Sequence, residues 1–261
     1  MDLITAGLGF VLAYVIGLTG VGGGALVAPA LFVIVDLPYA DAVGTSLVYA
    51  LLTKILSAAQ HIRQGTVQWR LALLFGLWGI PGAVAGSYLL HGVGSELERV
   101  FPLLMGGLLL LVAGLLAGEA SGLPRFRRAR ALSPEKLSAL GWLGIGAYAL
   151  AVGALMGVTS VGSGSLIILC MVYLFDLSAR TVVGTNIVLA LMMVLPAAAT
   201  HLGLGGVNLR VLGFLLIGSL AGAVLGSRTT IWIPDRVLRF AIVLFIAVSA
   251  IATFGKVGWA S

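Results

Sequence analysis

The sequence contains little charge and almost no cysteine. Only 9% of its 261 residues are charged, whereas 60% are hydrophobic and the mean hydropathy is +1.15. A water-soluble domain of this size could not bury so much apolar surface in its core. The composition therefore predicts an all-α polytopic membrane protein whose partner is the lipid bilayer. Cys170 is the only cysteine, so no internal disulfide and no multi-thiolate metal site can form.

Acidic residues are missing from the interior of every apolar run. All nine lie at or beyond the ends of the predicted spans: Asp2, Asp36, Asp41, Glu96, Glu98, Glu119, Glu135, Asp176 and Asp235. No mid-membrane carboxylate is therefore available to carry protons or to bind a metal. Nucleotide-binding loops, Ser/His/Asp arrangements and His/Cys metal spacings are also absent. We expect no catalytic residues, no metal and no cofactor, and hence no enzyme.

The positive net charge does not indicate nucleic-acid binding. The formal charge is +6, but the basic residues lie between apolar runs and not on an amphipathic face or among stacked aromatic residues. They are most concentrated in the segment 123–136, which the positive-inside rule assigns to the cytoplasm. We therefore expect no nucleic-acid partner, and the chain divides into a first transmembrane repeat at 1–118, a basic cytoplasmic linker at 119–138 and a second transmembrane repeat at 139–261.

The two halves are copies of one unit. Residues 17–87 align without gaps on residues 157–227, with 25 identities in 71 positions, where this skewed composition gives roughly 9% by chance. The segment 17–24 (GLTGVGGG) falls on 157–164 (GVTSVGSG), and 44–46 (GTS) falls on 184–186 (GTN). His61 falls on His201. The identities indicate an internal duplication.

Each copy begins with a long apolar stretch that glycines interrupt. The 33 residues from Leu3 to Val35 would make a helix of about 50 Å, against a hydrocarbon core of about 30 Å. This length favours two half-length helices that meet at the glycine break, although a re-entrant pair and two short full passes both stay open. Three ordinary spans follow, near 43–62, 67–90 and 99–118 in the first copy and near 182–203, 208–230 and 237–255 in the second.

Charge favours inverted repeats over parallel ones. If each broken stretch returns to its own side, eleven basic residues lie inside and three outside, whereas the parallel arrangement gives nine and five. The positive-inside rule prefers the first split. We therefore predict two inverted repeats, each a broken helix pair plus three transmembrane helices, with both termini outside.

Inverted repeats with broken helices are a recurrent transporter design, in which half-helix N-termini face an anionic substrate near the midplane. Helix N-termini carry partial positive charge and unpaired N–H donors, and glycine lets a ligand approach them. The alternative is that the small residues only allow close helix packing. The predicted substrate-binding residues are Thr19, Gly20, Gly22, Gly23, Gly24, Thr45, Ser46, Lys54, His61, Thr159, Ser160, Gly162, Ser163, Gly164, Ser165, Thr185, Asn186 and His201.

Several of these residues have a second interpretation. Thr45 and Thr185 open the span that follows each break, where they could cap a helix or contribute to the site. Lys54 falls near the midplane, where a charge is costly, so it should face the interior and could be a substrate counter-ion. His61 and His201 could be interfacial hydrogen-bonding residues, or they could carry protons.

The order of these motifs resembles the TauE/SafE family of membrane transporters. The resemblance rests on the segment 17–24 followed by 29–31 (PAL), on 44–47 (GTSL) and on His61 with 65–67 (GTV), and it extends over nearly the whole chain. It implies alternating-access transport of a small sulfur-containing anion, sulfite or an organosulfonate such as sulfoacetate, across the bacterial cytoplasmic membrane. A passive anion channel, a carrier of a non-sulfur carboxylate and an intramembrane enzyme are the competing functions, and homo-oligomerisation stays an open question.

Overall fold

The described part of the chain consists mainly of helices. The computed structural model describes residues 2–19, 24–92, 100–120, 138–161, 165–175, 177, 179–229 and 235–259. The first half contains α1 (Asp2–Thr19), α2 (Gly24–Val33), α3 (Tyr39–Arg63), α4 (Trp69–Gly92) and α6 (Val100–Ala120). The second half contains α7 (Ala139–Thr159), α8 (Ser165–Leu174), α9 (Ala179–Gly203), α10 (Leu209–Thr229) and α11 (Asp235–Trp259). Most of the linker, residues 121–137, lies outside the described residues.

The helices of the two halves follow the same register. α3 and α9 begin and end at positions that differ by the offset of the sequence repeat, and α4 and α10 begin at equivalent residues. The turns before α4 and α10 also correspond, because Gly65 and Gly205 have φ values of 65° and 77°. This left-handed conformation suits glycine, which has no Cβ to clash. The duplication is therefore visible in the backbone as well as in the sequence.

Each broken stretch contains one long and one short helix. α1 has 18 residues and α7 has 21, whereas α2 and α8 have 10 each. At ~1.5 Å per residue, only the second member of each pair has half the length of a span. The expectation of two half-length helices was wrong for α1 and α7, because unbroken apolar sequence precedes each glycine segment and the break falls at its end.

Several pairs of helices connect the halves, among them α6 with α11 and α4 with α9. α1 packs against α10, α4 against α7, and α3 against α9. A Cβ atom at Gly82 of α4 would overlap the carbonyl oxygen of Leu150 in α7, and one at Gly222 of α10 would overlap that of Phe10 in α1. These two contacts are equivalent under the repeat. The glycines thus let backbones approach closely at both places, and the packing interpretation holds for them.

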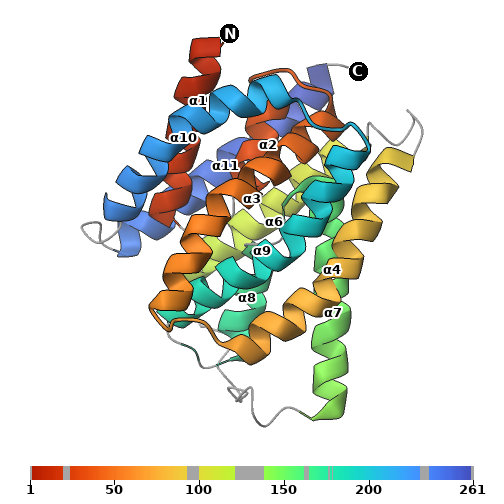
Figure 1. The fold of residues 1–261 in the computed structure, drawn as a ribbon, viewed down its shortest axis with the longest axis vertical. Helices are drawn as coiled ribbons and strands as arrows, with labels where there is room; N and C mark the ends of the chain where they lie inside the picture. The colour runs from red at the N-terminus through yellow and green to blue at the C-terminus, as the bar shows by residue number, and fades with distance from the viewer. Residues whose placement is uncertain are drawn as a thin grey trace.

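The course of α3 and α9 is antiparallel. Gly44, near the start of α3, lies against the Cβ of His201 at the end of α9, and Gly184, near the start of α9, lies against Thr66 just after α3. Such reciprocal contacts are the signature of a two-fold relation between two copies. In Figure 1, α1 begins and α11 ends at the same end of the molecule.

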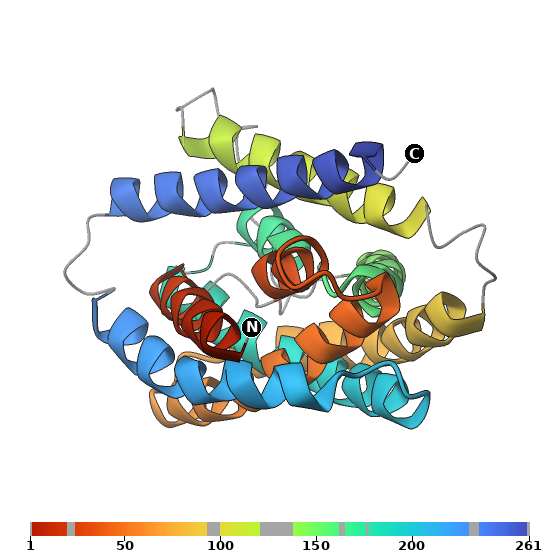
Figure 2. The ribbon, with the colours of Figure 1, turned by 90° about the horizontal axis from the view of Figure 1, so that it is seen from above.

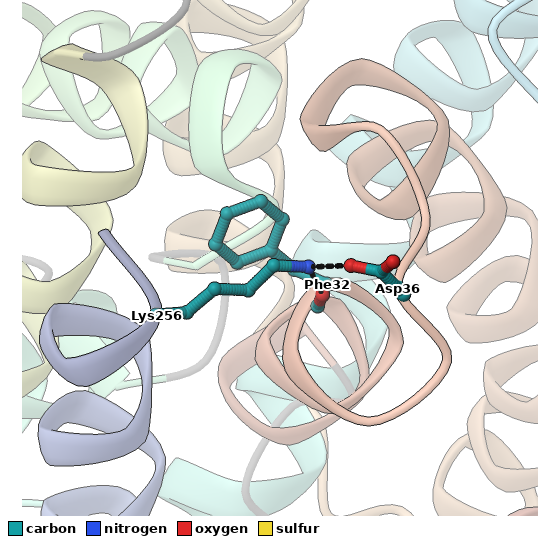
Figure 3. Close-up of polar contacts among 3 residues, drawn as sticks. All are labelled: Phe32, Asp36 and Lys256. Atoms are coloured by element: carbon teal, nitrogen blue, oxygen red, sulfur yellow. Dashed lines mark hydrogen bonds and ion pairs between the residues drawn. The ribbon is translucent and has the colours of Figure 1, made fainter. Parts of the chain in front are cut away.

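The short helix α2 lies in the interior. Figure 2 shows α6 and α11 side by side along one edge, with the other helices beneath them. Leu26, Val27, Ala28 and Leu31 of α2 are at most 4% exposed. At its end, Lys256 of α11 donates hydrogen bonds to the Phe32 carbonyl and the Asp36 carboxylate, and its ammonium lies 4.2 Å from the centre of the Phe32 ring (Figure 3). This contact fixes the end of α2 to α11.

The outer surface is apolar. Leu77, Ile217, Phe240 and Ile251 are between 62% and 68% exposed on α4, α10 and α11. Among the described residues, three helical segments are long and apolar enough to cross a membrane: Trp69–Gly92, Gly141–Thr159 and Thr181–Gly203. Shorter apolar segments lie in α1, α6, α10 and α11. Large exposed apolar side chains on several helices are what a lipid-facing surface requires.

Candidate functional site

The start of α2 lies directly against the end of α7. A Cβ atom at Gly24 would overlap the carbonyl oxygen of Ser160 and would lie 2.7 Å from its hydroxyl oxygen. Gly24 is therefore required here by close backbone approach. Because α2 begins at Gly24 and α7 ends just before Ser160, the broken stretch of the first repeat meets that of the second inside the molecule.

Ser160 has the backbone conformation that ends α7. Its φ is 58° and its ψ is −8°, and its N–H donates to the carbonyl of Met156 at 2.7 Å. A left-handed residue at this position is a common helix C-cap, although glycine is the usual choice. Ser160 pairs in the repeat with Gly20, which lies outside the described residues. The serine keeps the turn and adds a buried hydroxyl, only 2% of the residue being exposed.

Ser46 of α3 completes this contact. Its hydroxyl oxygen lies 2.7 Å from that of Ser160, within hydrogen-bonding distance, and 2.8 Å from the carbonyl oxygen of Val43. Both serines are buried. Three predicted residues, Gly24, Ser46 and Ser160, are therefore brought together from α2, α3 and the end of α7.

Asn186 is the repeat equivalent of Ser46, and its side chain is unsatisfied. The residue is 1% exposed, yet among the residues that the structure describes neither its amide nitrogen nor its amide oxygen has a hydrogen-bond partner. Leaving a buried polar group unpaired costs about 1–3 kcal/mol. Such groups are rare in folded proteins and call for an explanation, a missing ligand among them. α8, which starts at Ser165, packs against α9, where Asn186 lies.

Lys54 is a second uncompensated polar group. It lies on α3 two turns beyond Ser46, it is 7% exposed, and it forms no ion pair with any residue in the described ranges. The sequence predicted that it faces the interior, and its burial confirms that. A buried ammonium without a carboxylate beside it attracts an anion.

Thr45 and Thr185 do not cap their helices, and their contribution to the substrate site stays a prediction. Both lie inside their helices, because α3 begins at Tyr39 and α9 at Ala179, so the N-cap interpretation was wrong. Thr45 accepts a hydrogen bond from the backbone N–H of Asn208, and Thr185 accepts one from that of Gln68. Pro38, with φ fixed for a first helical turn, precedes α3 and explains its earlier start.

The two predicted histidines have different surroundings. His61 is half-buried, and its Nδ1 atom lies 2.9 Å from the Thr66 hydroxyl. His201 is fully buried, with Nε2 3.1 Å from the carbonyl oxygen of Gly157 and Nδ1 2.9 Å from Nε2 of His91. Sequence reasoning missed His91, because its repeat equivalent is Ile231 and no local pattern marks it.

Of the remaining predicted residues, some lie within the described ranges and the others lie outside them. The hydroxyl of Thr159 lies 2.6 Å from the Leu155 carbonyl and accepts from the N–H of Val161, so the backbone already occupies it. Thr19 and Ser165 end α1 and begin α8. Gly20, Gly22, Gly23, Gly162, Ser163 and Gly164 lie outside the described residues.

Comparison with known proteins identifies the family. The profile of the family described as "Sulfite exporter TauE/SafE" matches residues 5–253. This chain belongs to that family. It is 33% identical over 251 residues to the probable membrane transporter protein YjnA of Bacillus subtilis, which covers 94% of this chain and 96% of that protein.

Further relatives agree with this assignment. The chain is 27% identical to the probable membrane transporter protein YdhB of Bacillus subtilis, over 93% of this chain and 96% of that protein. It is 26% identical to a probable membrane transporter protein of Xylella fastidiosa, over 86% and 83% of the two chains. No solved structure matches. The chain is therefore a TauE/SafE family membrane transporter and not an enzyme, and its apolar helices are those of a multi-pass membrane protein.

Proposed function

We propose that this TauE/SafE family transporter carries a small sulfur-containing anion, sulfite or an organosulfonate such as sulfoacetate, across the bacterial cytoplasmic membrane by alternating access. The anion binds at the two helix breaks near the midplane. The observation that carries this proposal is the buried amide of Asn186, whose donor and acceptor lack partners in the described structure. A sulfite or sulfonate group offers three acceptor oxygens to that amide and to the free N–H groups at the start of a short helix.

Charge supports an anion as the cargo. Lys54 is buried without a neighbouring carboxylate in the described structure. The carboxylates of the described residues lie near helix ends, so in this part of the chain the interior contains a positive group and no negative one. An anionic substrate provides the missing charge when it binds.

The repeats are proposed to be inverted in the membrane, with both termini outside and the basic linker 119–138 inside. The antiparallel course of α3 and α9 supports this arrangement. A two-fold axis that exchanges two antiparallel helices is perpendicular to them, so it lies in the plane of the membrane that they cross. Alternating access then consists of rocking of one repeat against the other about the contact between Gly24 and Ser160.

Counterflow in proteoliposomes tests the proposal. Vesicles loaded with unlabelled sulfite or sulfoacetate should accumulate the labelled anion, and vesicles loaded with acetate should not. Conductance without counterflow would indicate a channel. Accumulation of simple carboxylates with equal efficiency would indicate a carboxylate carrier.

Replacing Asn186 by leucine tests the site. Asn186→Leu removes two unpaired buried polar atoms, so the unfolding free energy should stay the same or rise, while anion counterflow should be lost. The neighbouring Ile187→Leu, also buried, is the matched control and should retain counterflow. Full activity in Asn186→Leu would contradict the site.

A further inference from the structure

The rings of His91 and His201 form a hydrogen-bonded pair between two helices. His91 lies on the last turn of α4 and is half-buried, whereas His201 lies on the last turn of α9 and is fully buried. The His91 Nε2 and His201 Nδ1 atoms are 2.9 Å apart, and the ring planes meet at 62° with centroids 4.8 Å apart. The pair thus connects an accessible ring to a buried one.

The backbone determines which nitrogens carry protons. His201 Nε2 lies 3.1 Å from the Gly157 carbonyl oxygen. A carbonyl only accepts, so His201 donates through Nε2, and the Nδ1 atom of the neutral ring must accept. His91 therefore donates to it through Nε2. This assignment leaves Nδ1 of His91 as an acceptor that has no partner among the described residues.

The pair can take up one proton without losing a hydrogen bond. A proton on His91 Nδ1 produces an imidazolium that still donates through Nε2 to His201. A second proton would have to go to His201 Nδ1, where it would face the N–H of His91 and break the bond between the rings. The capacity of the pair is therefore a single proton, bound on the half-buried ring.

His201 connects this proton to the second helix break. Gly157 is in the last turn of α7, where carbonyl groups lack partners within the helix. His201 satisfies one of them, three residues before Ser160, which contacts Gly24 and Ser46. Positive charge near a helix C-terminus is favourable. Protonation of the pair and the geometry of the α7 terminus are thus energetically linked.

Within the described ranges, few charged groups surround the pair. The carboxylate of Asp41 on α3 acts electrostatically on His91. The turn 204–208 beside both rings has no ionisable side chain, and neither does α7 from 153 to its end. Gly206 lies directly against His91, with the virtual Cβ 2.7 Å from Nε2. Among the residues that the structure describes, Asp41 is therefore the acidic group that acts on a positive His91, while Glu96 and Glu98 follow α4 outside the described ranges.

The symmetry-related position, where His61 and residue 231 would meet, has no such pair. His61 occupies the place of His201, but its Nδ1 contacts the Thr66 hydroxyl, and the position of His91 corresponds to Ile231. The duplication therefore provides one proton site where a symmetric protein would have two. A single site between the ends of α4 and α9, without a symmetry-related copy, responds to the proton concentration at one end of the molecule.

We propose that the His91–His201 pair is the proton-binding site of this transporter, and that its single proton controls the second helix break and so couples anion movement to a proton gradient. This inference rests on the proposed carrier function.

Nuclear magnetic resonance of the full-length protein in lipid nanodiscs tests the site without transport. The chain has three histidines, so three labelled imidazoles can be assigned with single substitutions. His201 should be the Nε2–H tautomer, and one protonation step should shift the signals of His91 and His201 together. Two independent titrations, or a His201 protonated at Nδ1, would overturn the proposal.

Two glycines of the same turn region supply a matched pair for transport. Gly206→Ala places a methyl group against His91 and separates the rings while keeping all three histidines. Gly203→Ala meets nothing within 4 Å. With sulfoacetate as the probe, whose charge is constant between about pH 6 and pH 8, an imposed proton gradient should change wild-type and Gly203→Ala uptake. Gly206→Ala and His91→Gln should lose that response.

Failure of the proposed carrier function and failure of the proposed proton coupling would give different results. If the wild type moves neither sulfoacetate nor sulfite, the proposed function fails, and the shared protonation step in the nanodisc spectra still decides the proton site. If counterflow is normal but the gradient response of His91→Gln equals that of the wild type, the coupling role is wrong while the carrier function stands.

Discussion

Thr45 of the first repeat accepts a hydrogen bond from the backbone N–H of Asn208 in the second repeat at 2.9 Å. The equivalent bond, from the N–H of Gln68 to Thr185, measures 2.8 Å. Each donor belongs to the turn that leads into α4 or α10, and each acceptor lies on the opposite repeat. Each bond joins a residue near the start of one of the helices α3 and α9 to the turn that follows the other helix. They explain why both copies keep a threonine here.

Removing either hydroxyl should weaken the association of the repeats. Thr45→Val and Thr185→Val preserve side-chain shape but leave a backbone N–H unpaired, which costs about 1–3 kcal/mol. The two variants should lose similar amounts of unfolding free energy, measured by denaturant titration in detergent. Thr200→Val is the control, since its hydroxyl donates only to the Pro196 carbonyl of its own helix. A loss confined to one of the two variants would contradict the equivalence of the bonds.

Gly24→Ala should strongly reduce stability and transport, although it adds only one methyl group. The added methyl group would overlap the backbone carbonyl of Ser160, which cannot rotate away, and overpacking of this kind costs about 1–3 kcal/mol or more. Gly107→Ala meets nothing within 4 Å and should be neutral or stabilising, since alanine favours a helix by up to about 1 kcal/mol. Thermal unfolding and anion counterflow should both fall in Gly24→Ala. Wild-type behaviour would show that the two broken stretches can separate at no cost.

The hydrogen bond between Ser46 and Ser160 can be measured by a double-mutant cycle. Ser46→Ala, Ser160→Ala and the double variant should give a coupling energy of about 0.5–1.5 kcal/mol, the usual net value for a buried neutral hydrogen bond. Denaturant unfolding at constant lipid content provides the four stabilities. Additive losses would mean that the two hydroxyls do not depend on each other.

The sequence predicted much of the fold because the relevant signals are local. Spans of apolar residues, glycine breaks and the register of the duplication locate α3, α4, α9 and α10 to within a few residues. The start of α3 was placed four residues late, because the segment 39–42 contains a tyrosine and an aspartate that interrupt the apolar run. Tyr39 is nevertheless buried, between the rings of Phe32 and Phe101.

The candidate site was less predictable, because its contacts join residues far apart in the chain. Repeat position singled out Ser46, Ser160 and Asn186, which are buried polar residues, and their predicted role in binding the substrate stays a prediction. The same reasoning could not say that the Thr45 hydroxyl meets a backbone N–H more than 160 positions away. It also missed His91, because that residue breaks the symmetry on which the reasoning relied.

The ion pair between Asp36 and Lys256 predicts a specific dependence on pH. The Lys256 ammonium, through a hydrogen bond and its charge, holds the pKa of the Asp36 carboxyl below the ordinary value of 3.8. A carboxyl with a lowered pKa stabilises the folded state above its unfolded pKa, and this contribution disappears as the pH falls through the folded value. Asp36 is fully exposed, so the effect should be small.

The test compares Asp36→Asn with the wild type across that range. Asparagine tolerates the left-handed backbone found at Asp36, where φ is 61°, so the substitution removes charge without adding strain. The melting temperature of Asp36→Asn should be lower than that of the wild type at neutral pH, and the difference should vanish as the pH falls through the lowered pKa of Asp36. Lys256→Met, which also removes the contact with the Phe32 ring, should lose more stability at neutral pH than Asp36→Asn does. A difference between Asp36→Asn and the wild type that persists unchanged into strong acid would mean that the carboxylate charge is not what joins α2 to α11.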